Sequence, residues 1–218
     1  MQKSEKISKT VFYGILDTGY VDPQNMYEKC RQLIAGGCGL IQLRAKKESS
    51  LERAKLAEEI LPLFDTKNAP IFIINDDIDL AKNIEIAGLH IGQDDFDPRK
   101  AREILGDKKT LGLSTHSLEQ AKKANSLKGV LDYFAVGPLF ATQTKPGRTP
   151  VGLELVGLVK NMRPALPWFC IGGVNLNTAA LVAKAGAERI VAVSDVLKPA
   201  DTAAAVKALT ASFLAAKP

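Results

Sequence analysis

The chain has 218 residues, 46% of them hydrophobic and 24% charged, which is typical of one globular domain with a full core. Its formal net charge of +5 is compatible with anionic ligands, but no basic block is long enough to indicate a nucleic-acid surface. The three cysteines form no CxxC pair, which argues against a disulfide framework or zinc site, and no apolar run is long enough to span a membrane.

Short apolar runs alternate with helical patterns along the chain. Residues 1–10 are polar, lack the apolar region of a signal peptide, and are predicted to be a flexible segment. The predicted strands are 11–17, 40–43, 71–74, 89–91, 110–113, 131–136, 167–171 and 189–193. The predicted helices between and after them are 22–36, 49–61, 77–81, 97–105, 117–124, 152–162, 177–185 and 200–215.

This strict alternation predicts a parallel sheet. Eight strand–helix units in a chain of this length favour a closed (β/α)8 TIM barrel, a single domain over residues 11–218. An open doubly wound sheet is the alternative. It is less favoured because no GxGxxG follows the first strand and no Walker A sequence is present.

Acidic clusters end two consecutive predicted strands. Asn75-Asp76-Asp77 follows one strand and Gly92-Gln93-Asp94-Asp95 follows the next. Because neighbouring parallel strands end at the same edge of a sheet, these carboxylates are expected to lie close together, where they would repel unless a cation lies between them. An all-oxygen set without His or Cys suits Mg²⁺. Each cluster alone is also typical of a helix N-cap, and Asp77 is predicted to be one.

Basic and polar residues follow two other predicted strands. Alternation places Gln42, Arg44 and Lys46 on one face of their strand, pointing toward the mouth of the barrel, where Arg and Lys would suit a diphosphate. Taken alone, Arg44-Ala45-Lys46 is more typical of a basic surface turn. Ser114 and His116 follow the fifth strand. A single histidine at such a place is more often structural than catalytic.

The long connection at residues 137–152 carries Thr142, Thr144 and Lys145, whose hydroxyl and ammonium groups can bind an anion. Because it is much longer than the roughly 2–6 residues usual between a strand and a helix, we expect a lid over the barrel mouth. A surface loop with an exposed lysine is the alternative.

The last two strands end in residues suited to a phosphate. Gly172-Gly173 follows the seventh strand and Val193-Ser194 ends the eighth. In such barrels the loops after these strands are the usual phosphate site. With a diphosphate site near Arg44 and no nucleophile paired with a base, the layout suits the joining of two phosphorylated substrates with loss of diphosphate.

Taken in order, these segments resemble the thiamine-phosphate synthase family. The matching segments span nearly the whole chain: Gln42-Leu43-Arg44-Ala45-Lys46, Ile74-Asn75-Asp76-Asp77, His90-Ile91-Gly92-Gln93-Asp94-Asp95, Ser114-Thr115-His116-Ser117, Gly137-Pro138, Thr142-Gln143-Thr144-Lys145, Ile171-Gly172-Gly173 and Val193-Ser194. Ala141 departs from the proline often found there, and the segment 146–150 has no assigned role.

The resemblance implies a Mg²⁺-dependent TIM-barrel transferase that joins an aminopyrimidine diphosphate to a thiazole phosphate. It implies a dissociative reaction, in which diphosphate leaves before the thiazole nitrogen captures the pyrimidine cation. By the family pattern, Asp76 and Asp95 hold the metal. The pyrimidine diphosphate contacts are Gln42, Arg44, Lys46, Asn75, Ser114 and Lys145, of which Arg44, Lys46, Ser114 and Lys145 are catalytic. The thiazole phosphate contacts are Thr142, Thr144, Gly173, Val193 and Ser194.

Two other functions stay open. A thiazole tautomerase on the same barrel would need no diphosphate site, and a non-catalytic barrel that binds a phosphorylated ligand would need no paired carboxylates. We expect a cytoplasmic protein without nucleic-acid or membrane partners, and a homodimer is compatible with the sequence.

Overall fold

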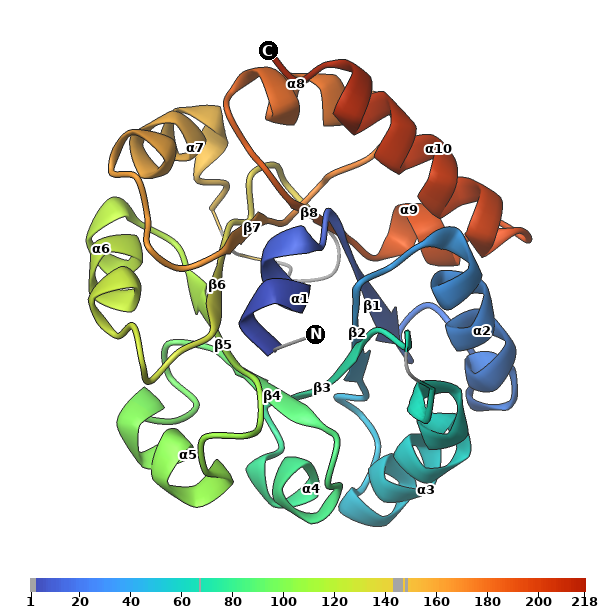
Figure 1. Ribbon diagram of the computed structural model, residues 1–218. Coiled ribbons are helices and arrows are strands. Elements are labelled where there is room, and N and C mark those ends of the chain that lie inside the picture. Colours follow the sequence, from blue (N-terminus) through green and yellow to red (C-terminus); the bar gives the residue numbers. More distant parts are fainter. Residues whose placement is uncertain (1–2, 67, 143–146, 148) are drawn as a thin grey trace.

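The computed structural model describes residues 3–66, 68–142, 147 and 149–218. Eight parallel strands close into a barrel in the order β1 to β8, as Figure 1 shows, so the predicted (β/α)8 fold is confirmed. The strands are β1 (Phe12–Asp17), β2 (Leu40–Arg44), β3 (Ile71–Asn75), β4 (Gly88–Ile91), β5 (Leu111–Thr115), β6 (Tyr133–Val136), β7 (Trp168–Cys170) and β8 (Ile190–Ala192).

Helices surround this barrel on its outer face (Figure 1). They are α2 (Met26–Gly36), α3 (Ser50–Ile60), α4 (Ile78–Asn83), α5 (Pro98–Leu105), α6 (Leu118–Ser126), α7 (Gly152–Asn161), α8 (Ala179–Lys184), α9 (Ser194–Leu197) and α10 (Thr202–Ala215), with 3-10 turns at Pro23–Asn25 and Leu61–Phe64. Within the described residues, none of the helices is long and apolar enough to cross a bilayer.

The predicted starts of α3, α4, α5 and α6 agree with the observed caps, whereas α2, α8 and α10 begin two to four residues later than predicted. Ser49 and Glu52 form a reciprocal capping box at the start of α3. The carboxylate of Asp77 accepts a hydrogen bond from the backbone N–H of Leu80 at 3.0 Å, so the predicted N-cap of α4 is confirmed. These caps end the strand-to-helix loops sharply, and the residues between strand and cap therefore have fixed positions at the barrel rim.

A short helix that the sequence analysis does not predict, α1 (Lys3–Lys9), lies across one end of the barrel (Figure 1). Its Ile7 is fully buried, and Lys3 forms a 2.9 Å ion pair with Asp132. One buried residue in seven gives no periodic pattern, which explains why sequence reasoning found no helix. The division between residues 1–10 as a flexible segment and 11–218 as the catalytic domain stays a prediction.

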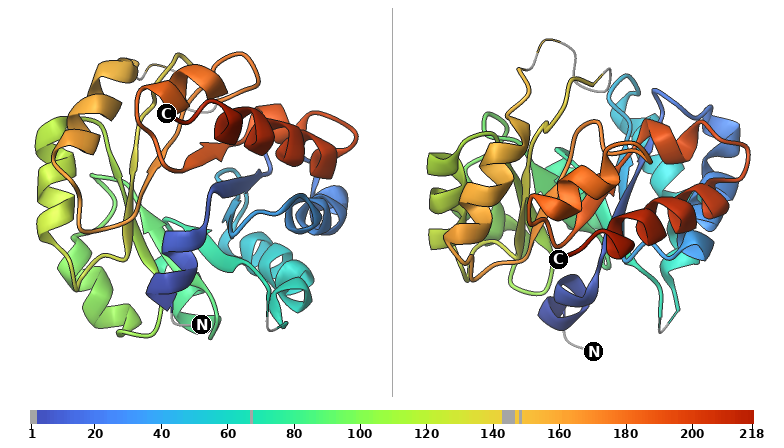
Figure 2. Two further views of the ribbon diagram at one scale, coloured as in Figure 1. Left: turned by 45° about the horizontal axis from the view of Figure 1, so that its top comes forward. Right: turned by 90° about the horizontal axis from the view of Figure 1, so that it is seen from above.

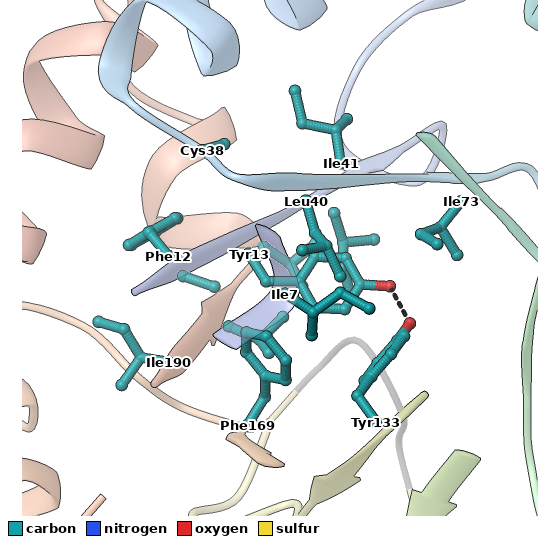
Figure 3. Close-up of a cluster of buried hydrophobic side chains, with 14 of the residues drawn as sticks. Ile7, Phe12, Tyr13, Cys38, Leu40, Ile41, Ile73, Tyr133, Phe169 and Ile190 are labelled. Atoms are coloured by element: carbon teal, nitrogen blue, oxygen red, sulfur yellow. Dashed lines mark hydrogen bonds between the residues drawn. The ribbon is translucent and has the colours of Figure 1, made fainter. Parts of the chain in front are cut away.

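Inside the barrel, the end nearest α1 is filled by side chains. Ile7 lies beside the rings of Tyr13, Tyr133 and Phe169, as Figure 3 shows, and all four are buried. Each pair of these three rings meets edge to face, with centroids 5.4–5.8 Å apart. The interior is therefore open to ligands from the opposite end, where the strands finish. Figure 2 shows α1 projecting from one end of the molecule.

Candidate functional site

The main cavity opens at the carboxyl ends of the strands, where the active site of such a barrel is expected. It is lined by the predicted residues Gln42, Arg44, Asn75, Ser114, Thr142, Gly173, Val193 and Ser194 and also by His90, His116 and Gly172. A second hollow beside it is lined by Lys46, Asp76, Asp94 and Asp95. Since Arg44, Asn75, His90 and Ser114 border both spaces, the two form one continuous site.

The two predicted metal ligands lie against each other in the second hollow. Burial, a hydrogen bond with the Asp76 carboxyl and the charge of that group raise the pKa of Asp95 above its usual value. The backbone N–H of Gly92 donates to Asp95 at 2.6 Å, and Asp76 has a left-handed backbone with φ of 59°. The loops thus hold two carboxyl groups at a distance where like charges oppose each other.

Two residues partly offset this charge. The Lys46 ammonium forms an ion pair with Asp76, and the Asn75 side-chain amide donates to the same carboxylate at 2.7 Å. In the described part of the chain, no group of three or more His, Cys, Asp or Glu side chains could enclose a metal ion. Two carboxylates without His or Cys fit Mg²⁺, which keeps waters and completes its coordination with substrate phosphates.

Arg44 faces the cavity from the end of β2. One of its terminal nitrogens donates to the Asp17 carboxylate at 2.6 Å, and the Asp17 side chain is only 2% exposed. Its Nε is buried and finds no hydrogen-bond partner among the described residues. A buried donor without a partner is costly, so this guanidinium is ready to bind an anion from the cavity.

Asp17 is a site residue that sequence reasoning missed. It ends β1, and the barrel register places it directly beside Arg44. The signal was present, because the first predicted strand ends on a carboxylate while its neighbour ends on an arginine. The buried Asp17 carboxylate holds the guanidinium of Arg44 in one orientation.

At the other side of the cavity, the chain after β7 turns through two glycines. Gly172 and Gly173 have positive φ angles of 100° and 67°. A Cβ on Gly173 would lie 2.7 Å from Cβ of Phe140, and one on Gly172 would lie 2.5 Å from Cα of Pro138. Side chains are therefore excluded here both by conformation and by space, which leaves the backbone itself to line the cavity.

Two predicted residues of this side lie at the start of α9, a helix that the sequence does not predict. Val193 precedes the helix and Ser194 is its first residue. The Ser194 hydroxyl donates to the Asp195 carboxylate at 3.1 Å. Four residues are too few to leave a periodic signal in the sequence.

Two predicted residues, Thr144 and Lys145, lie outside the described residues, so their roles and the expected lid stay predictions. Thr142 lines the main cavity. His116, for which the sequence favours a structural role, has its Nδ1 against the carbonyl oxygen of Gly137. This contact joins the ends of β5 and β6.

Comparison with known proteins gives one consistent family. A family model described as thiamine monophosphate synthase matches residues 12–196. A thiamine-phosphate synthase of Arthrobacter sp. is 40% identical over 200 residues, which cover 82% of this chain and 84% of that protein. One from Pelotomaculum thermopropionicum is 40% identical over 203 residues, covering 91% and 90%.

The relatives differ in length. The chain spans 50% of the length of a Prochlorococcus marinus protein of the same name, to which it is 38% identical over 180 residues. Among solved structures, a thiamine phosphate pyrophosphorylase from Pyrococcus furiosus superposes with a TM-score of 0.75 at 25% identity, over 96% of this chain and 98% of that one.

Proposed function

The chain belongs to the thiamine monophosphate synthase family, and we propose that its cavity joins an aminopyrimidine diphosphate to a thiazole phosphate, giving thiamine phosphate and diphosphate. The chain is thus a transferase of thiamine biosynthesis, as its relatives' names indicate. The observation that carries the site assignment is that two opposed carboxylates and Lys46 line a hollow that is continuous, through Arg44, with the cavity lined by the glycine turn after β7.

The diphosphate is proposed to bind in the hollow that Asp76, Asp95, Lys46 and Arg44 line. Asp76 and Asp95 would hold Mg²⁺, which would supply positive charge to the diphosphate oxygens. Arg44 would donate to the same group through its buried Nε, and Lys46 would add a second positive charge. These groups would stabilise the diphosphate as it leaves with the bonding electron pair.

This arrangement agrees with a dissociative reaction. Breaking the carbon–oxygen bond leaves a cation on the pyrimidine methylene, and the thiazole nitrogen supplies the electron pair of the new carbon–nitrogen bond. The residues proposed for the diphosphate side contribute positive charge rather than a nucleophile. Their role is to stabilise the negative charge of the leaving group.

The thiazole phosphate belongs at the turn after β7, with Gly173, Val193 and Ser194 as contacts. We expect Gly173→Ala to raise the KM for the thiazole phosphate by about 10-fold and to leave the pyrimidine KM within about twofold. The added methyl group would strain a backbone with φ of 67° and press on Phe140, which shifts the turn from the phosphate.

Steady-state kinetics with each substrate varied in turn checks this expectation. Gly37→Ala is the matched control, because Gly37 also has a positive φ, of 99°, but nothing lies within 4 Å of its added Cβ. It should lower stability without changing either KM. A change in the pyrimidine KM alone for Gly173→Ala would mean that the two ends of the cavity are assigned the wrong way round.

The function itself is tested by incubating the purified protein with both substrates and following thiamine phosphate and diphosphate with and without Mg²⁺. We expect both products in equal amounts and a loss of at least about 100-fold in rate when Mg²⁺ is chelated. A thiazole tautomerase would convert the thiazole alone without Mg²⁺, and a binding barrel would release no diphosphate; either result would overturn the proposal.

A cytoplasmic location and freedom from nucleic-acid partners remain parts of this proposal, supported by the small charged substrates and by the modest net charge of +5. A homodimer is likewise kept as an expectation, to be checked by the mass of the protein in solution.

A further inference from the structure

A continuous chain of hydrogen bonds crosses the interior of the barrel along the floor of the cavity. Its five members come from different strands and are all buried: Gln42, Tyr13, Tyr133, His90 and Ser114. We call this set the interior hydrogen-bond chain. The consecutive distances, in that order, are 2.6, 2.9, 3.0 and 2.9 Å. All of its members except Tyr133 line the main cavity, and no role in the reaction has so far been assigned to its three middle members.

The centre of the chain is the contact between two tyrosine hydroxyls. Figure 3 shows Tyr13 and Tyr133 pointing toward each other, with the hydrogen bond between their oxygens. Both rings are at most 1% exposed, and burial raises the pKa of each tyrosine above its ordinary value. Each hydroxyl therefore keeps its proton and has one hydrogen to donate.

A glycine makes room for the next link. Gly112 on β5 pairs with His90 on one side and Tyr133 on the other, and a Cβ at Gly112 would lie 2.1 Å from the Tyr133 ring. Without that side chain, the rings of His90 and Tyr133 stack with centroids 5.6 Å apart. The sheet thus places the Tyr133 hydroxyl against Nδ1 of the imidazole.

The direction of donation follows from counting hydrogens. The Gln42 amide nitrogen donates to the Tyr13 hydroxyl oxygen. In the described part of the chain, the hydroxyl of Tyr13 bonds only to Gln42 and Tyr133, so its own hydrogen goes to Tyr133. Were Tyr133 to donate to Tyr13 instead, the Tyr13 hydrogen would be buried without an acceptor, which is costly.

The remaining two links are then fixed. Tyr133, which accepts from Tyr13, donates its hydrogen to Nδ1 of His90. A neutral imidazole that accepts at Nδ1 carries its hydrogen on Nε2, so it donates to the Ser114 hydroxyl oxygen. Because Ser114 accepts from His90, its own hydrogen points elsewhere, and Ser114 borders both parts of the cavity.

We propose that the interior hydrogen-bond chain runs in this one direction and that His90 and Tyr133 are positioning residues, which hold the Ser114 hydroxyl as a donor toward an acceptor atom of the pyrimidine diphosphate. The role of Ser114 toward the substrate rests on the proposed function. The direction of the hydrogen bonds and the tautomer of His90 do not depend on it. The chain also links Ser114 to Gln42, so a change in the donor at one end of the cavity alters the group offered at the other.

The first test reads the imidazole directly. The sequence has two histidines, so ¹⁵N-histidine labelling gives two ring systems by NMR, and His116→Asn identifies the signals of His90. We expect the Nε2–H form of His90 in the ligand-free protein, and a mixture of both neutral forms in Tyr133→Phe. An Nδ1–H form in the wild-type protein, or no change in Tyr133→Phe, would overturn the proposed direction.

The second test separates positioning from packing by a double-mutant cycle. Tyr133→Phe is expected to lower kcat/KM for the pyrimidine diphosphate about 10-fold, and Ser114→Ala about 100-fold. Because Tyr133 acts through Ser114, adding Tyr133→Phe to Ser114→Ala should change kcat/KM by less than about twofold. Losses that multiply fully in the double variant would show that Tyr133 has only a packing role and would overturn the proposal.

Phe169→Leu is the matched control, because Phe169 contacts both tyrosine rings but has no hydroxyl. It should lower stability and leave the His90 tautomer unchanged. If Tyr133→Phe does not fold, Tyr13→Phe removes the same chain one link earlier and is expected to give the same imidazole mixture. A wild-type protein that makes no thiamine phosphate would refute the proposed function, whereas the NMR result would still decide the direction of the chain.

Discussion

Replacing Asp95 with asparagine should lower kcat about 1000-fold at ordinary Mg²⁺ concentrations, the largest loss we expect from a single change. The substitution keeps the shape of the side chain and the acceptor for the Gly92 N–H, but it removes one of the two charges proposed to hold the metal. Without the metal, the departing diphosphate would lose its main source of positive charge, which costs about 4 kcal/mol.

The same variant makes a prediction that does not depend on turnover. In the absence of Mg²⁺, Asp95→Asn should unfold at a higher temperature than the wild-type protein, because the Asp76 carboxyl and the burial that raise the pKa of Asp95 both oppose its charge. The wild type should gain stability from Mg²⁺ and the variant should not.

Thermal unfolding at several Mg²⁺ concentrations, beside steady-state kinetics, measures both effects. Asp107→Asn is the control, since it removes an equal charge from an exposed residue just after α5. A variant of Asp95 with near wild-type activity, or with the same Mg²⁺-dependent stabilisation as the wild type, would refute the metal assignment.

Arg44→Lys should reduce kcat/KM for the pyrimidine diphosphate by roughly 100-fold, although the net charge is unchanged. Lysine can keep an ion pair with Asp17, so the buried carboxylate is not left unpaired. It cannot reproduce the fork of a guanidinium, which bonds Asp17 through one nitrogen and would donate to the anion through another.

The chain offers a close control for this substitution. Arg53 also pairs through its guanidinium with an aspartate, Asp77, at 2.8 Å, but it does not border the cavity. Arg53→Lys should leave kcat/KM within about twofold. Steady-state kinetics and product inhibition by diphosphate would compare the two variants, and equal effects would mean that Arg44 acts through stability rather than by contact with the anion.

Much of the barrel could be predicted because parallel strands buried on both faces appear as continuous apolar runs. All eight were found, and the ends differ from the structure by at most about two residues, as is usual. The ends of the strands could be predicted because the apolar runs stop there. Polar residues that interrupt an apolar run, such as Asn75-Asp76 and Asp94-Asp95, mark the point where a strand reaches the rim.

What the sequence could not supply is pairing across the barrel. Tyr13 and Tyr133 lie 120 positions apart, and only the closed register brings their hydroxyls together. His90 looked like part of an apolar strand, because its polar partners come from β5 and β6. Asp17 differs, because it pairs with Arg44 at the end of the next strand along the chain and could have been found from the sequence. The helix α1 contributes a single buried residue, too little for any pattern.

The packing of α1 and the aromatic rings at one end of the barrel has a consequence for how substrates bind and products leave. In the described part of the chain, buried side chains fill that end, so we expect both substrates to enter and both products to leave at the opposite end. If one substrate lies deeper in the cavity than the other, we expect it to bind first and its product to leave last. We therefore expect an ordered mechanism, which would follow from the packing of the helix Lys3–Lys9 against the closed end of the barrel.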